Sequence, residues 1–411
     1  MNEKLDSEFE RRREMMEQFY YRDIGQVIKK LRISSKMTQE SVAYGICSHT
    51  YISKLENNQI IGKRENVILI MEKMNVPIDE IYFPDEMISS LEDAINCFFY
   101  RDLPGYKEIF ERISEYNFST LLQVIKLGYY ILSDDYEEAG YIYNETFRYL
   151  NSLEDYGLSI FLIFAGYYNI GIKKYSRAKE IIGKIESKFI NDDITYALYS
   201  FSRFIIYGNL YKFLSASEAC MRALTVFNKY SNMERINEIH FWRKLFKLYE
   251  TNTKAHEYNL NCVKFINRQN INYFLVVLAL SSNEPQKYLN HLDKDSVNYS
   301  LGLFFKAKLS IEDENNELFT ETYNELDELH YKVESKLDYL HMLRLLKSKK
   351  EIEYKDYLIN FVIDYLQERQ DFFFLKLAYN EIVEILTNKN RYKDALIYKN
   401  KFEQFVLVMQ S

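Results

Sequence analysis

A short run of polar side chains near the N-terminus contains groups able to hydrogen-bond to the edges of base pairs. Hydroxyl, imidazole, phenol and ammonium groups follow one another within seven residues of Ser48. Such groups reach base edges in a major groove when they project from the first turns of a helix. We therefore predict base contacts by this set: Ser48, His49, Thr50, Tyr51 and Lys54.

A second set of polar residues lies just outside that run and suits contact with phosphate. Gln39 starts an expected helix, where the side chain and the positive end of the helix dipole can both meet a phosphate. Asn57 lies directly after the next expected helix and can do the same. The predicted phosphate contacts are Lys36, Thr38, Gln39 and Asn57.

Both sets require a small helical domain to position them. The apolar spacing predicts helices over 24–33, 39–44, 49–55, 65–74 and 78–82. Thr38 and Ser48 are good N-caps for the second and third helices, and Gly45 is expected to make the turn between them. The spacing of the apolar residues in this pair is typical of the core beneath two crossed helices, and the residues are Val42, Ala43, Ile46, Ile52 and Leu55.

Arg32 and Glu56 are expected to form an internal ion pair that joins the first helix to the end of the third. The charge balance supports a local anionic partner. Residues 22–74 hold nine Lys and Arg against five Asp and Glu, whereas the whole chain has a net charge of −7. A basic module on an acidic body fits contact with DNA phosphates at one place only.

The remainder of the chain shows a repeat of about 39 residues, read from an aromatic residue followed three positions later by alanine. Ala139, Ala178 and Ala216 carry the pattern, Ala255 continues it without the aromatic, and Ala395 returns to it. Each alanine is expected early in the second helix of a pair, where a small side chain allows close approach. Gly and Pro are scarce, at 12 and 4 of 411 residues. These features predict an all-α fold: a five-helix DNA-binding domain followed by a right-handed solenoid similar to tetratricopeptide repeats.

Several function classes find no support in the sequence. It contains no glycine-rich phosphate loop, nucleophile elbow or metal-ligand spacing, so we expect no enzyme, no metal and no cofactor. The four cysteines are far apart, and the apolar runs are too short to cross a bilayer. We expect a cytoplasmic protein with reduced thiols and no membrane partner.

A more specific resemblance rests on residues 38–57, which look like the helix-turn-helix of the Cro/repressor class. Within it, Gly45-Ile46-Cys47-Ser48 followed by Tyr51-Ile52-Ser53-Lys54-Leu55-Glu56 resembles the RRNPP family of Rgg, PlcR and NprR. That resemblance implies a transcription regulator in which the repeat domain binds a short signal peptide. Expected partners are double-stranded operator DNA, the peptide and a second copy of the chain. The chain is longer than many Rgg and PlcR relatives, so a further regulatory protein stays open as a partner.

The resemblance also implies asparagines that hold the peptide backbone from the inner helices of the repeats. With Tyr168, Tyr207 and Tyr392 as repeat markers, the candidates are Asn169, Asn209 and Asn380. The expected division is a charged extension over 1–22, the DNA-binding domain over 23–84, a linker over 85–95 and the repeat domain over 96–411. Two alternatives stay open: a switch of the Rap kind that sequesters a response regulator, and a plain phage or plasmid repressor.

Overall fold

The structure is a computed structural model of the 411-residue chain. It describes residues 24–25, 27–57, 59–60, 62–75, 84–113, 120–148, 153, 155–185, 190, 192–251, 270–296, 298–330 and 337–410. Within these ranges the regular structure is helical, and no strand occurs. The predicted all-α fold is confirmed.

The first part of the chain forms a small domain of short helices. Residues 27–34 are helical, and α2 (Gln39–Ala43), α3 (His49–Glu56) and α4 (Arg64–Lys73) follow. Its core contains four of the five predicted residues in fully buried positions, and Ile46 packs half-buried against them. Val27 and Ile28 from the first helix, and Val67, Ile70, Met71 and Met74 from α4 and its C-terminal end, complete the core. The fifth predicted helix, over 78–82, falls outside the described residues.

The two caps and the turn of this domain are built as the residue types predict. The Thr38 hydroxyl accepts a hydrogen bond from the Ser41 amide, and the Ser48 hydroxyl accepts one from the Tyr51 amide, both at 3.1 Å. These bonds satisfy N–H groups that have no partner inside the helix. Gly45 has a φ of 79°, a left-handed conformation that glycine adopts without steric cost. The starts of α2 and α3 and the turn between them are therefore set by local chemistry.

The chain folds into two compact units. The first contains residues up to 172 together with 180–202 and 226–235, and the second contains 173–179, 203–225 and 236–411. The earlier helices after the small domain are α5 (Pro84–Tyr100), α6 (Leu103–Ile113), α7 (Thr120–Leu132), α8 (Tyr136–Phe147), α9 (Asp155–Gly171), α10 (Tyr175–Ile182), α11 (Asp193–Asn209), α12 (Phe213–Lys229) and α13 (Met233–Thr251). The later ones are α14 (Ile271–Leu280), α15 (Pro285–Leu289), α16 (Tyr299–Glu312), α17 (Asn316–His330), α18 (Tyr339–Lys347), α19 (Glu351–Tyr357), the π-helical segment η6 (Leu358–Val362), α20 (Ile363–Glu368), α21 (Phe372–Asn388) and α22 (Tyr392–Gln410).

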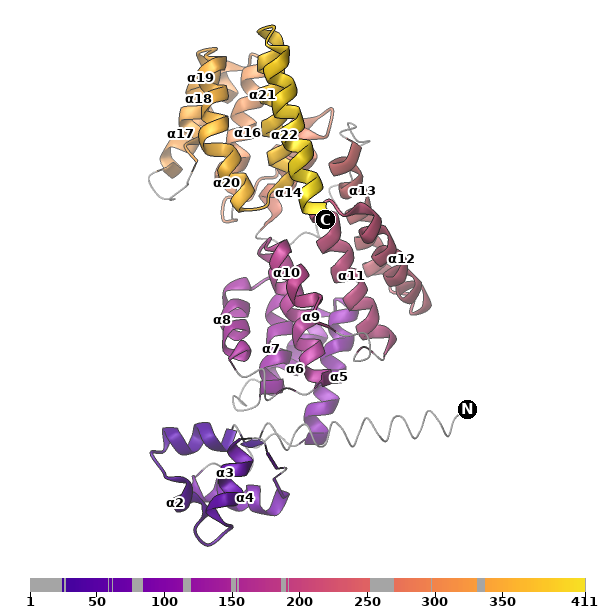
Figure 1. The fold of residues 1–411 in the computed structure, drawn as a ribbon, viewed down its shortest axis with the longest axis vertical. Helices are drawn as coiled ribbons and strands as arrows, with labels where there is room; N and C mark the ends of the chain where they lie inside the picture. The colour runs from indigo at the N-terminus through magenta and orange to yellow at the C-terminus, as the bar shows by residue number, and fades with distance from the viewer. Residues whose placement is uncertain are drawn as a thin grey trace. The chain divides into compact units, whose positions relative to one another are not determined.

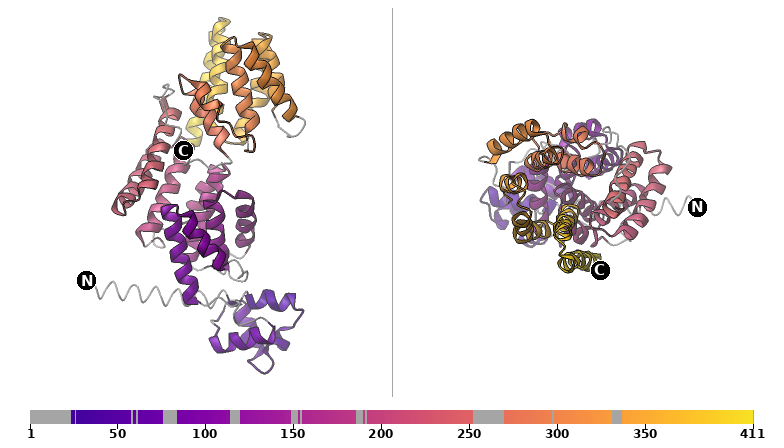
Figure 2. Two further views of the ribbon diagram at one scale, coloured as in Figure 1. Left: turned by 180° about the vertical axis from the view of Figure 1, so that it is seen from behind. Right: turned by 90° about the horizontal axis from the view of Figure 1, so that it is seen from above.

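Within each unit the helices pack as stacked pairs. In the first unit α7 contacts its partner α8 and also α5 and α9, the first helices of the neighbouring pairs. In the second unit α16 contacts α17, α14 and α18 in the same way, and α21 lies beside α22 (Figures 1 and 2). A single pair cannot bury its apolar face alone, so each pair packs that face against the next pair.

The repeat alanines lie where the pattern places them. Ala139, Ala178, Ala216 and Ala395 are each the fourth residue of α8, α10, α12 and α22, and all four are buried. Ala255 falls outside the described residues. A side chain no larger than a methyl group at this position lets the two helices of a pair approach closely.

Tight turns join consecutive helices in the described part of the stack, and the left-handed residue in them is not glycine. In nine of the described turns, a non-glycine residue with φ between 51° and 61° lies two positions before the next helix. These residues are Arg101, Asp134, Lys173, Tyr211, Ser231, Glu314, Lys349, Gln370 and Asn390. In most of them the following amide donates to the carbonyl five residues back, as Lys212 does to Tyr207 at 2.8 Å. This bond satisfies a carbonyl at the end of the first helix.

The predicted division of the chain needs one correction. Residues 85–95 are not a linker, because α5 runs through them without a break from Pro84 to Tyr100. Met87, Leu91 and Ala94 are buried, and α5 packs on α6 and α7. The segment is therefore the first helix of the stack. Residues 1–22 fall outside the described residues. In the described part of the chain, no helix is long and apolar enough to cross a membrane.

The close approach of neighbouring pairs can be tested at Gly171, the last residue of α9. A Cβ atom built there would collide with the ring of Tyr136 at the start of α8. We expect Gly171→Ala to lower the free energy of unfolding by about 1–3 kcal/mol, the usual effect of overpacking a core. Urea unfolding followed by circular dichroism measures this. Tyr141→Ala, at an exposed position on α8, is the matched control and should leave the midpoint nearly unchanged. Equal stability of Gly171→Ala and the parent would contradict the packing.

Candidate DNA-binding surface

Helix α3 has its apolar side chains buried in the core of the domain, while its N-terminal polar side chains are exposed to solvent. Ile52 and Leu55 are completely buried, whereas Ser48, His49, Thr50 and Lys54 are exposed. The predicted base-contacting set therefore shares one open face, apart from Tyr51. This geometry allows the exposed side chains to enter a groove of DNA while the rest of α3 stays fixed in the domain.

Tyr51 is half-buried and has a structural contact. Its ring packs against the core of the domain, and its hydroxyl accepts a hydrogen bond from the Lys63 amide at 2.8 Å. This bond holds the segment before α4 against α3. Tyr51 remains a predicted base contact, and its described contacts are with the core of the domain and with the Lys63 amide.

The predicted phosphate contacts differ in how accessible they are. Lys36, Thr38 and Asn57 are exposed, and the Asn57 amide donates to the Ser53 carbonyl within its own helix end at 2.9 Å. Gln39 is half-buried, and its Nε2 donates to Glu56 Oε2 at 2.7 Å. The Gln39 amide is thus tied to the end of α3, which fixes the crossing of α2 and α3.

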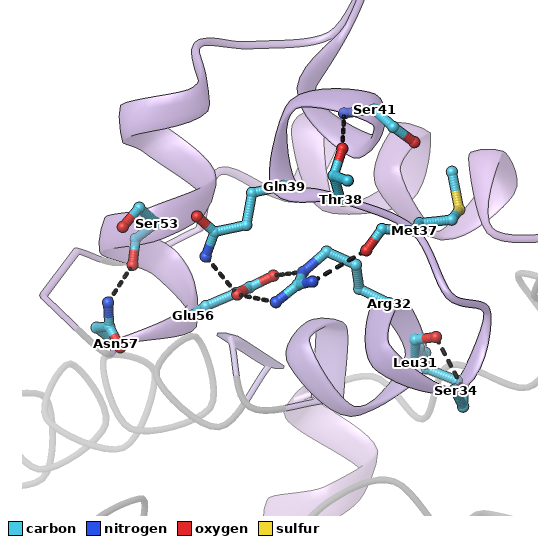
Figure 3. A network of polar contacts seen from close by, with 10 residues as sticks. All are labelled: Leu31, Arg32, Ser34, Met37, Thr38, Gln39, Ser41, Ser53, Glu56 and Asn57. Carbon is cyan, nitrogen blue, oxygen red and sulfur yellow. Dashed lines mark hydrogen bonds and ion pairs between the residues drawn. The ribbon is translucent and has the colours of Figure 1, made fainter.

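An ion pair lies beneath this surface. Arg32 Nε and Nη2 donate to the two oxygens of Glu56 at 2.5 and 2.9 Å, and Arg32 Nη1 donates to the Met37 carbonyl at 3.0 Å (Figure 3). Glu56 is 0% exposed. The hydrogen bond with Glu56 raises the pKa of Arg32, partly opposed by burial. The bidentate geometry is the strong form of such a pair, and here it joins the first helix, the segment before α2 and the end of α3.

A contact that the sequence pattern does not indicate lies at the other end of α2. Lys73, in the last turn of α4, donates from its ammonium to the Tyr44 carbonyl and lies 5.4 Å from the centre of the Tyr44 ring. Tyr44 is 83% exposed, directly before the turn that leads to α3. Because the two residues are 29 positions apart, no helical or turn periodicity could have paired them.

The family comparison agrees with this geometry. Residues 28–81 match the family model described as helix-turn-helix. The N-terminal domain is a helix-turn-helix domain. In it, α2 and α3 are the two helices on either side of the turn at Gly45. No curated protein sequence matches the chain.

Two solved structures resemble the chain over much of its length. One is the apo form of the quorum sensor NprR from B. thuringiensis, with 15% identity and a TM-score of 0.47 over 80% of this chain and 99% of that one. The other is Bacillus thuringiensis PlcR in complex with a peptide and DNA, with 13% identity and a TM-score of 0.32 over 63% of this chain and 96% of that one.

The predicted peptide contacts lie at different depths. Asn169, in α9, and Asn209, in α11, are 2% and 7% exposed. Their side-chain amides donate to the carbonyls of Ala165 and Ile205, at 2.7 and 2.9 Å, one turn earlier in the same helix. Asn380, in α21, is exposed. No group of His, Cys, Asp and Glu able to hold a metal occurs among the described residues.

Removal of Arg32 tests the ion pair beneath the helix-turn-helix domain. Arg32→Ala leaves a buried carboxylate without its guanidinium, and the expected loss in the free energy of unfolding is about 3 kcal/mol. Removing both charges, as Arg32→Met with Glu56→Leu, should cost less than Arg32→Ala, because no buried charge remains. Thermal unfolding of the two variants and the parent measures this. The role assigned to the pair is wrong if Arg32→Ala and the parent unfold at the same temperature.

Proposed function

We propose that this chain is a transcription regulator that binds operator DNA through its helix-turn-helix domain and binds a short signal peptide through its helical repeats. The peptide controls DNA binding, and the protein acts in the cytoplasm without enzymatic activity. The observation that carries the proposal is the exposed polar face of α3 on a domain whose crossing angles are fixed by Arg32, Glu56 and Gln39.

DNA reading is supported by how the functional groups are divided. His49, Thr50 and Lys54 are exposed on the first turns of α3, and none of them is needed for the buried core of the domain. Lys36 adds an exposed ammonium before α2. Base-contacting groups on α3 with cations beside them give sequence readout together with sequence-independent affinity.

A dimer follows from the length of the reading helix. α3 contains eight residues, and a single helix of this kind covers too few base pairs to select one site in a genome. We therefore propose a homodimer on a two-fold symmetric operator. The long helical stack, which takes up most of the chain, supplies surface for dimerisation and for the peptide.

The DNA-reading role predicts two classes of variant. His49→Ala and Lys54→Ala should each weaken binding to a specific duplex by about 1–3 kcal/mol and relax sequence preference if the residue reads a base. Lys36→Ala should instead weaken binding to all duplexes alike and reduce the salt dependence by about one charge. The specific duplex is first selected from a randomised pool with the full-length protein, and affinities are then measured by fluorescence anisotropy.

The control for this series is Leu69→Ala, which truncates a half-exposed apolar residue on α4. It should bind the selected duplex as the parent does. Unchanged affinity and preference in both α3 variants would remove them from the reading face. Failure to select any duplex would count against DNA binding itself and in favour of a protein-interaction switch.

Peptide control rests on the resemblance and on the amide side chains of the repeats. An asparagine side chain offers both a donor and an acceptor, so it can pair with the N–H and C=O groups of an extended peptide. Asn169 and Asn209 use one N–H each within their own helices. Peptide binding that uses the other amide atoms would change operator affinity by linkage.

Calorimetry on the full-length protein tests this role. The ligands are synthetic peptides whose sequences come from small secreted proteins encoded beside the gene. We expect Asn169→Ala, Asn209→Ala and Asn380→Ala each to weaken binding. Asn144→Ala is the matched control, because Asn144 in α8 donates to a carbonyl one turn earlier in the same manner. Tight binding unaffected by all three substitutions would remove these residues from the site. No binding by any such peptide would favour a plain repressor.

A further inference from the structure

The C-terminal end of α5 is held by two side chains that come from more than 130 residues later in the chain. Asn232 Nδ2 donates to the Phe99 carbonyl at 2.8 Å. Arg235 donates from Nε to the Phe99 carbonyl at 3.2 Å and from Nη2 to the Phe98 carbonyl at 2.6 Å. We call these three bonds between α5 and the start of α13 the α5–α13 clamp.

The clamp is buried and electrostatically suited to its place. Asn232 is 2% exposed and Arg235 is 3% exposed. The guanidinium of Arg235 lies at the carbonyl end of α5, where the helix dipole places partial negative charge. It also lies 5.5 Å from the centre of the Phe98 ring and 5.4 Å from that of Phe201. Breaking the clamp would leave a cation buried among carbonyls and aromatic rings.

The same two residues also begin α13. Asn232 Oδ1 accepts the amide of Arg235 at 3.2 Å, which satisfies an N–H in the first turn of α13. Asn232 therefore caps the start of α13 with its oxygen and the end of α5 with its nitrogen. The amide group cannot turn to serve one helix without releasing the other.

The two clamped helices have different roles in the chain. α5 begins at Pro84, soon after the helix-turn-helix domain, which ends its family match at residue 81. α13 runs to Thr251, and its residues from 236 onward belong to the second unit. The clamp thus joins the helix that follows the DNA-reading domain to a helix that continues far into the repeats.

We propose that Asn232 and Arg235 are positioning residues that make the last turn of α5 and the first turn of α13 unfold and refold together, in one cooperative step. Through the clamp, a conformational change in the later repeats alters α5, the helix that follows the DNA-reading domain. That use of the clamp rests on the proposed function, whereas the cooperative opening of the two helix ends does not.

Amide hydrogen exchange on the full-length protein tests cooperative opening without DNA. Asn232→Asp keeps an oxygen to cap α13 but replaces the donor to Phe99 by an oxygen. We expect exchange to become about tenfold faster or more, to the same extent, in the last turn of α5 and the first turn of α13. Arg235→Met should act in the same way. Faster exchange at only one of the two helix ends, or at neither, would overturn the proposal.

A matched control separates coupling from general loss of stability. The Tyr106 hydroxyl donates to the Ile125 carbonyl at 2.9 Å, and Tyr106 is 0% exposed, so Tyr106→Phe removes one buried bond elsewhere in the first unit. It should speed exchange around α6 and α7 and leave the ratio of rates at the two clamped ends as in the parent. Equal acceleration of the clamped ends by Tyr106→Phe would show a general effect and overturn the specific role.

A second experiment tests signalling, with the duplex selected from the randomised pool as the probe. In the parent, the duplex should change exchange in the first turn of α13 as well as in α5. In Asn232→Asp, the change in α13 should disappear while the change in α5 remains. A change that persists in α13 of the variant, or that is absent from α13 of the parent, overturns the signalling role. If no duplex binds, the proposed function fails, and the exchange rates of the free protein still decide whether the clamp exists.

Discussion

The architecture depends on one constraint: two helices joined by a very short turn must lie close enough to bury their shared apolar face. The turn meets it with a residue in the left-handed conformation two positions before the second helix. The buried alanine at the fourth position of helices such as α8 and α12 then permits contact. Stacking of pairs, and with it nearly all of the described core beyond the first domain, follows from this geometry.

The helix-turn-helix domain is too small for a large apolar core, so polar contacts help to fix its helices. It contains an ion pair in which the buried Glu56 accepts hydrogen bonds from Arg32 and Gln39. Such a pair adds less net stability than its short distances suggest, since both groups must lose water. Its value is orientation: α2 and α3 cannot change their crossing without breaking the hydrogen bond between Gln39 and Glu56. A stiff crossing suits the proposed role of α3, which is to present side chains to base edges.

Asn232 and Arg235 use the same chemistry at longer range. In both places a guanidinium donates to oxygen acceptors from a distant part of the sequence, a carboxylate at Glu56 and helix carbonyls at Phe98 and Phe99. Directional donors fix angles that apolar packing leaves free. The protein thus combines a stack of helix pairs held by apolar packing with a few polar contacts at Glu56, Asn232 and Arg235. These contacts lie next to the helices proposed to read DNA and to transmit a signal.

The sequence by itself determined what depends on near neighbours: the helical class, the caps at Thr38 and Ser48, the turn at Gly45 and the positions of the repeat alanines. Each follows from a side chain acting within about one helical turn. It also predicted that His49, Thr50 and Lys54 are exposed, because the periodicity of a helix separates buried from open faces, but it placed Tyr51, which is half-buried, on the same face. Tertiary structure alone decided that residues 85–95 belong to α5, that Tyr51 holds Lys63, and that Asn232 and Arg235 cap α5. The left-handed turns escaped sequence reading, because Tyr211 or Lys349 adopts that conformation only when packing of the flanking helices offsets its steric cost. Contacts between residues far apart in the chain leave no periodic signal in one sequence, since any of many buried carbonyls could accept the same donor.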